Sequence, residues 1–202
     1  MQTFIDHARN FRARAARESH EFERLAQGQA PLALFITCSD SRVIPSLITG
    51  SRPGELFELR TAGNIVPPYR LDRPSGEAAT IEFAVQVLGV SDIVVCGHSH
   101  CGAVGALVRR DDLAAVPALR GWLADAVPAP PGQDGARPRV ALPQDDYADA
   151  VQAHVLDQLD RLRGYPAVRD RLAAGRIGLH AWFYEVHTGA VLAHRSGAFL
   201  PL

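Results

Sequence analysis

The chain has 202 residues and a balanced charge, with 21 basic side chains against 22 acidic ones. This length fits one domain with a sizeable core. The balance leaves no basic excess of the kind that binds nucleic acid or anionic membrane surfaces. The sequence has neither an apolar run of about 18 residues nor a signal-peptide core. We therefore expect a soluble cytoplasmic protein that neither spans a membrane nor binds nucleic acid.

The N-terminal segment, residues 1–27, is predicted to be a helical arm. Its apolar residues recur at helical spacing among many Arg, Glu and Ala residues, and Gly28 ends the pattern. Such an arm has little core of its own, so we expect it to pack on something else, such as another subunit. Residues 27–202 are predicted to form the core of a single domain that covers the whole chain, 1–202.

Two largely apolar runs, residues 32–37 and 92–97, are typical of strands that are buried on both faces. A shorter strand is predicted over 55–60, and a helix over 77–88 that ends at Gly89. Strands of this kind that alternate with helices predict an α/β fold, with a mostly parallel central sheet flanked by helices. Ligands of such sheets bind at the carboxyl ends of the strands.

The second half of the chain continues this alternation. Residues 128–138 are rich in Pro and Gly and predict a surface loop rather than a domain boundary. Residues 145–163 predict an amphipathic helix with its apolar side chains on one face. The other predicted elements are helices over 101–110, 113–126 and 166–175, and strands over 177–184 and 190–194.

Cysteine and histidine residues follow two of the predicted strands. Cys38 follows the first strand, and His98 follows the third. Two residues separate His98 from Cys101, which is a usual spacing for two ligands of one zinc ion. Two thiolates and one imidazole suit zinc, and three protein ligands leave the fourth position open, as in catalytic sites. The alternative is a set of buried, inert cysteines, and spacing alone does not decide between the two.

Three blocks of sequence resemble motifs of the β-class carbonic anhydrases, and the plant-type members most of all. Residues 38–42, Cys-Ser-Asp-Ser-Arg, are similar to the block that supplies the first ligand and an Asp–Arg pair. Residues 97–102, Gly-His-Ser-His-Cys-Gly, are similar to the block that supplies the other two ligands, and residues 60–66 resemble the segment between them. The resemblance implies one Zn²⁺ per chain, held by Cys38, His98 and Cys101.

The same resemblance implies reversible hydration of carbon dioxide to bicarbonate and a proton. Zinc with an open position lowers the pKa of bound water to roughly 7, so that hydroxide forms near neutral pH. Asp40 is implied to orient the attacking hydroxide by accepting its hydrogen bond, and Arg42 to hold Asp40 in a bidentate pair. The pocket residues that the resemblance implies are Gln29, Phe57, Ala62, Phe83 and Gly102.

Two positions depart from the plant-type pattern. Phe83 stands where those enzymes have Tyr, and Thr61 stands where they have Asn. Neither residue is expected to touch the metal, so the departures concern rate and pocket polarity. Cys96 lies inside an apolar run and is expected to pack in the core. His100 is not expected to bind the metal, because a pair two residues apart in a loop rarely reaches one ion.

Two other functions remain open. The same fold and ligands can hydrolyse carbonyl sulfide or carbon disulfide, and a permanently closed fourth position would make a non-catalytic, zinc-stabilised bicarbonate-sensing or interaction module. The Asp40–Arg42 pair and Gln29 count against the module, because a structural site has no need of them. In the family Gln29 and Phe57 serve a cleft between two subunits, which predicts a homodimer or a dimer of dimers.

Overall fold

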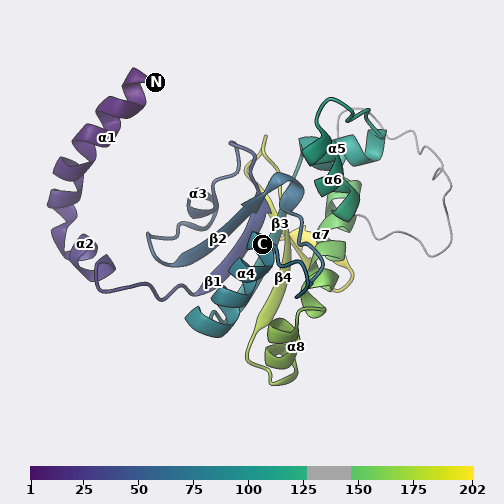
Figure 1. Ribbon diagram of the computed structural model, residues 1–202. Helices are drawn as coiled ribbons and strands as arrows, with labels where there is room; N and C mark the ends of the chain where they lie inside the picture. The colour runs from purple at the N-terminus through teal and green to yellow at the C-terminus, as the bar shows by residue number, and fades with distance from the viewer. Residues whose placement is uncertain (127–146) are drawn as a thin grey trace.

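A computed structural model of the chain describes residues 1–126 and 147–202 (Figure 1). The strands are β1 (Ala33–Cys38), β2 (Leu56–Thr61), β3 (Asp92–His98), β4 (Gly178–Tyr184), β5 (Val191–Arg195) and β6 (Ala198–Pro201). Among the described residues they form one sheet in the order β2-β1-β3-β4-β5-β6. The pairs β1–β2, β1–β3 and β3–β4 are parallel, whereas the pairs β4–β5 and β5–β6 are antiparallel. The predicted mostly parallel sheet is confirmed.

The predicted alternation of helices and strands is also confirmed. The helices are α1 (Gln2–Ala15), α2 (Ser19–Leu25), α3 (Pro45–Thr49), α4 (Gly76–Glu82), α5 (Gly102–Arg109), α6 (Pro117–Ala126), α7 (Ala148–Arg163) and α8 (Pro166–Ala173). The helix α4 continues as a π-helix over Phe83–Leu88, and a short 3₁₀ turn spans Ala62–Asn64. Within the described ranges no helix combines the length and apolarity needed to cross a bilayer. The loop predicted over 128–138 lies outside the described residues.

The strand order places the ends of β1 and β3 side by side. β1 pairs with β2 on one side and with β3 on the other, and Thr37 stands opposite Cys96 in the register. The connection after β1 leads to β2 on one side, and the connection after β3 leads to β4 on the other. The carboxyl ends of β1 and β3 therefore flank a crevice of the kind where α/β sheets bind ligands. Cys38 ends β1 and His98 ends β3, so both lie at this crevice.

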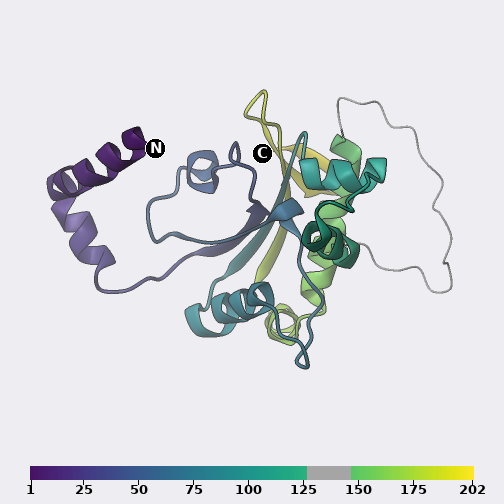
Figure 2. The same cartoon turned by 45° about the horizontal axis from the view of Figure 1, so that its top comes forward.

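The main core joins one face of the sheet to α4, α5, α7 and α8, as Figures 1 and 2 show from two directions. The amphipathic face predicted for α7 is buried there: Val151, Val155, Leu159 and Leu162. A smaller cluster lies on the other face of the central strands and holds Phe35, Val94 and Cys96. Its partly buried neighbours are also strand residues, so within the described chain this second cluster is built without helical side chains.

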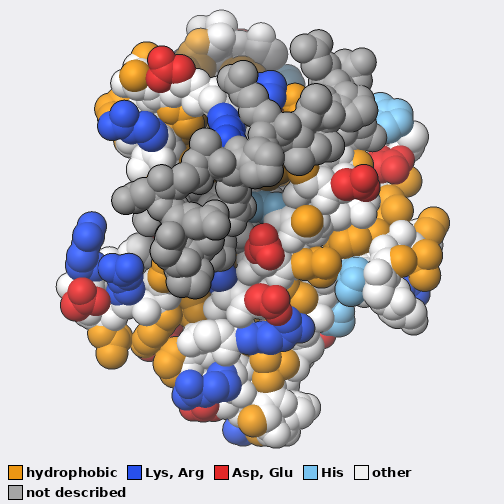
Figure 3. Space-filling view, turned by 90° about the vertical axis from the view of Figure 1, so that its right-hand side faces the viewer, with side chains coloured by type: hydrophobic (Ala, Val, Ile, Leu, Met, Phe, Trp, Pro, Cys, Tyr) orange, Lys and Arg blue, Asp and Glu red, His pale blue; other side chains and the backbone are white. Residues whose placement is uncertain are grey.

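The N-terminal arm is helical, as predicted, and extends away from the sheet (Figures 1 and 2). α1 has no buried residue. Phe4 is 72% exposed and Phe11 is 49% exposed, although Phe11 contacts Phe22 edge-on. On another face of the molecule, the described basic and acidic side chains are interspersed among apolar ones (Figure 3), in keeping with the net charge of −1.

Gly97 is expected to be indispensable for the packing of α7 on β3. A Cβ at this position would lie 2.6 Å from methyl groups of both Val151 and Val155. We expect Gly97→Ala to destabilise the fold by about 1–3 kcal/mol, the usual cost of overpacking, in urea unfolding. Gly121→Ala in α6 is the control, because nothing lies within 4 Å of the added Cβ. Equal stability of the two variants would contradict this packing.

Candidate metal centre

Cys38, His98 and Cys101 come together at the carboxyl edge of the sheet. Their ligand atoms all lie within 4.8 Å of one another, and all three residues are buried. The sulfur atoms of Cys38 and Cys101 are 4.0 Å apart, about twice the length of a disulfide bond. Both cysteines are free. The structure therefore unites the three residues that the sequence singled out, in a group small enough to surround one metal ion.

The imidazole of His98 is prepared to bind a metal. Its Nδ1 lies 2.9 Å from the carbonyl oxygen of Ser99, and a carbonyl only accepts, so Nδ1 carries the proton. Nε2 is left with a free lone pair, buried and without a hydrogen-bond partner among the described residues. An orphaned buried nitrogen is costly. Two thiols and an imidazole nitrogen are a set of donors that binds zinc. The hydrogen bond from the other ring nitrogen to a carbonyl is the usual support of a zinc-binding histidine.

The thiol of Cys101 donates a hydrogen bond to the sulfur of Cys38. The pKa of Cys38 is lowered, chiefly because the thiol of Cys101 donates a hydrogen bond to it, and the same bond together with burial raises the pKa of Cys101. A cation bound between the sulfurs would release this proton, since thiolates are the metal-binding form. Cys96 differs from both: burial raises its pKa to about 12, and it packs as a small apolar residue, as predicted.

Asp40 and Arg42 form a bidentate pair beside this group. The Arg42 guanidinium donates to both carboxylate oxygens at 2.9 and 2.7 Å, and the Arg42 backbone N–H adds a third bond of 2.9 Å. These bonds hold the pKa of Asp40 well below its usual range, so the carboxyl group is ionised at neutral pH. Oδ2 of Asp40 lies 3.9 Å from Nε2 of His98. A fixed acceptor thus stands next to the position of the metal.

The loop that carries Asp40 is held by Arg60, whose role the sequence did not reveal. The Arg60 guanidinium donates to the carbonyl oxygens of Cys38, Asp40 and Val43, at 3.0, 2.8 and 2.7 Å for the same nitrogen. Arg60 belongs to a block of sequence that resembles the family. This resemblance draws attention to Arg60 but does not identify the groups that it binds. Every residue carries a carbonyl, so no sequence pattern identifies these acceptors.

The predicted pocket residues divide into two groups. Ala62 follows β2 and Gly102 opens α5, so both lie at the carboxyl edge with the ligands. Phe57 instead pairs with Leu34, four residues before Cys38, which places it roughly 13 Å back along the strands. Phe83 contacts Phe57 there, at 5.9 Å between ring centroids, and Gln29 precedes β1 altogether. One chain does not bring these three to its own metal ligands.

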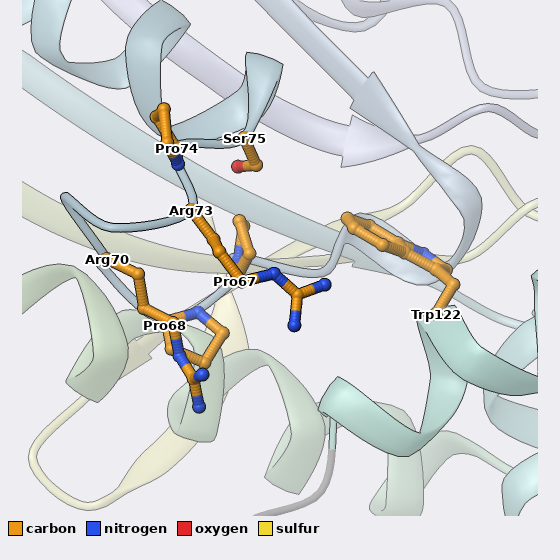
Figure 4. A pocket seen from close by; sticks show the side chains of 7 residues that line it. All are labelled: Pro67, Pro68, Arg70, Arg73, Pro74, Ser75 and Trp122. Atoms are coloured by element: carbon orange, nitrogen blue, oxygen red, sulfur yellow. The ribbon is translucent and has the colours of Figure 1, made fainter.

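A cavity of about 300 Å³ has Trp122 in its lining but none of Cys38, His98 and Cys101 (Figure 4). Its lining residues are Pro67, Pro68, Arg70, Arg73, Pro74, Ser75 and Trp122. Figure 4 shows the guanidinium of Arg73 extending between Pro67 and Trp122. Trp122 also donates its indole N–H to the carbonyl oxygen of Ala62 at 2.8 Å, so it connects this cavity to the turn beside the ligands.

Comparison with known proteins places the chain in a family. A sequence model of the carbonic anhydrase family matches residues 33–191. A carbonic anhydrase of Pseudomonas aeruginosa is 48% identical over 174 residues, which are 86% of this chain and 77% of the relative. The solved structure of the β-carbonic anhydrase CcaA superposes with a TM-score of 0.85 at 35% identity, covering 100% of this chain and 99% of that one. This chain belongs to the β-carbonic anhydrase family.

Other β-carbonic anhydrases share the whole fold. One chain from the crystal structures of two tetrameric β-carbonic anhydrases from the filamentous ascomycete Sordaria macrospora gives a TM-score of 0.74 at 30% identity, covering 98% of this chain and 99% of that one. Membership of the family agrees with the resemblance in the motif blocks. It also agrees with zinc as the metal that the Cys38–His98–Cys101 group fits.

Cys38→Ser is expected to abolish zinc binding, because a hydroxyl replaces one of the two soft thiolate ligands. Elemental analysis of the purified variant should find far less than one zinc per chain. The control is Cys96→Ser, which removes a buried thiol of the opposite sheet face and should keep the metal. Full zinc occupancy in Cys38→Ser would contradict this assignment of the ligands.

Proposed function

We propose that this β-carbonic anhydrase homologue converts carbon dioxide and water reversibly to bicarbonate and a proton. The observation that carries the proposal is the orphaned Nε2 of His98, buried beside two free thiols, with an ionised carboxylate 3.9 Å away. Cys38, His98 and Cys101 would hold zinc. When bound, zinc in such a site supplies hydroxide as nucleophile near neutral pH by lowering the pKa of water to roughly 7.

Asp40 and Arg42 would orient the attacking oxygen. Asp40 is ionised and can only accept, so its Oδ2 would hold the hydrogen of the attacking oxygen and direct a lone pair at the carbon of carbon dioxide. Arg42 keeps the carboxylate from turning, because it binds both oxygens. A non-catalytic zinc module has no use for an ionised acceptor held in this way.

The positions of the other predicted pocket residues support a second copy of the chain as part of the site. Gln29, Phe57 and Phe83 lie at the opposite end of the strands from the ligands of their own chain. We propose that the chain works as a cytoplasmic homodimer, alone or as a dimer of dimers, in which these residues complete the substrate cleft of the neighbour. The arm, residues 1–27, would reach across to the core of the partner with its α1 helix, which has no buried residue within its own chain. Each chain would then be one domain over 1–202.

Asp40→Asn is the test of the proposed reaction. The amide keeps the size of the side chain but presents a donor as well as an acceptor, so the attacking oxygen loses its fixed partner. We expect carbon dioxide hydration, followed by stopped flow, to fall by about 10²-fold or more while zinc content stays at one per chain. Arg42→Ala should act in the same direction.

Near-normal hydration by Asp40→Asn would remove Asp40 from the mechanism. Hydration by the unmutated zinc protein no faster than by buffer would refute the function itself. Carbonyl sulfide and carbon disulfide, assayed in parallel, would reveal the alternative hydrolase.

Removal of residues 1–25 is expected to damage assembly. The arm carries exposed apolar side chains, and the surface that it covers on a partner would become exposed in turn. Light scattering of the truncated protein should show an unstable or aggregating product, with hydration lost alongside. A truncated chain that is monomeric, soluble and fully active would contradict both the role of the arm and the shared cleft.

A further inference from the structure

The peptide group between Ala62 and Gly63 touches the metal centre through its N–H. The Gly63 N–H donates to Sγ of Cys38 at 3.4 Å. Two thiolates would cancel the double positive charge of zinc and weaken its ability to acidify water. A hydrogen bond to one thiolate withdraws charge from the sulfur and offsets this effect. The orientation of this one peptide group therefore matters to the chemistry of the metal.

Glycine is strongly favoured at position 63 of the turn. Gly63 has a φ of +76°, a left-handed conformation that disfavours side chains, and a Cβ there would meet the Cβ of Ala103 at 3.0 Å. A glycine brings conformational freedom, so the sequence of the turn does not by itself fix the direction of the N–H. Contacts from elsewhere in the chain must do so.

Trp122 in α6 holds the other end of the same peptide group. Its indole Nε1–H donates to the carbonyl oxygen of Ala62 at 2.8 Å. The carbonyl of Ala62 and the N–H of Gly63 belong to one planar unit, so fixing the oxygen fixes the direction of the N–H. The indole, the peptide and the sulfur of Cys38 thus form a continuous chain of hydrogen bonds, in which each bond polarises the next.

His154 in α7 holds the following peptide group. Its Nε2 lies 2.8 Å from the carbonyl oxygen of Gly63, so this nitrogen carries the proton. Burial lowers the pKa of His154, which keeps the imidazole neutral. One helical turn later, Gln158 accepts from the backbone N–H of Val66 at 2.9 Å. Both peptide groups that flank Gly63 are therefore fixed by side chains from two different helices.

We propose that Trp122 and His154 are positioning residues of the metal centre, which direct the Gly63 N–H at the sulfur of Cys38 and so set the charge on that ligand. Both side chains bond to carbonyl oxygens of the turn and act through its backbone. The inference rests on the proposed function, because it requires a metal at Cys38. The competing view is that Trp122 only packs, since its ring also contacts the small cluster around Leu123.

Trp122→Phe separates these two views, because it keeps an aromatic ring and removes the N–H donor. Cobalt(II) in place of zinc reports the charge on sulfur through the sulfur-to-metal charge-transfer absorption. We expect this band to move to longer wavelength in Trp122→Phe, since a thiolate with a weakened hydrogen bond gives up charge more readily. Zinc affinity in a chelator competition should fall by about 10- to 100-fold, the usual effect of losing support around a ligand.

Trp182→Phe is the matched control, since Trp182 is the second tryptophan of the chain, half-buried on β4 against Phe35. It should leave the cobalt band and the zinc affinity unchanged. His154→Leu should shift the band in the same direction as Trp122→Phe. His154→Gln should bring it back, because the amide nitrogen of Gln can donate to the same carbonyl.

Each outcome decides the proposal. A cobalt band and a zinc affinity in Trp122→Phe equal to those of Trp182→Phe would overturn it. In the unmutated protein loaded with cadmium-113, scalar coupling between the metal and the Gly63 amide proton should be observed, and its absence would overturn the proposal without any variant. If the unmutated protein binds neither cobalt nor cadmium, the proposed function fails instead, so the two failures are distinguishable.

Discussion

The parallel pairing of β1 with both β2 and β3 is the constraint on which the centre depends. It delivers Cys38, the turn after β2 and His98 to one edge of the sheet, side by side. Backbone groups at such an edge leave the ladder and need other partners. Arg60 supplies donors for three carbonyls of the loop after β1, and Trp122 and His154 supply donors for the turn after β2. Side chains from elsewhere in the chain thus fix the carbonyl groups next to the candidate ligands.

Charge explains why the centre combines a buried interior with a half-exposed ion pair. Two thiolates and an imidazole are buried, and thiolates so close together are costly unless a cation lies between them. The acceptor beside them, Asp40, is ionised at little cost because Arg42 binds both of its oxygens from the solvent side, with 47% of the Arg42 side chain exposed. Two buried sulfurs and a held carboxylate therefore lie beside one candidate metal position, and a donated N–H bonds to one of the sulfurs.

The sequence predicted β1 to β5, α7 and the grouping of Cys38, His98 and Cys101, but not the contacts that hold the turn. β1 and β3 follow from their apolar runs and α7 from its apolar periodicity, because burial in the core requires both patterns. The grouping of Cys38, His98 and Cys101 follows from their spacing, their places at the ends of strands and the resemblance of their sequence blocks to family motifs. β6 was missed because four residues ending in Pro201 carry little pattern. The donors Arg60, Trp122 and His154 bind backbone carbonyls, which every residue possesses, so only the folded chain reveals which carbonyl each one meets.

A single chain completes the metal centre but not the proposed substrate cleft. The ligands, the Asp40–Arg42 pair and the supports of the turn all come from residues 38–163 of one chain, and their hydrogen bonds close within it. Phe57 and Phe83 instead lie toward the opposite end of the strands from that centre, Gln29 precedes β1, and Phe83 is 41% exposed. Metal affinity should therefore depend on the fold of one chain, whereas turnover should depend on the association of two. Dilution that separates subunits is expected to reduce hydration while zinc stays bound.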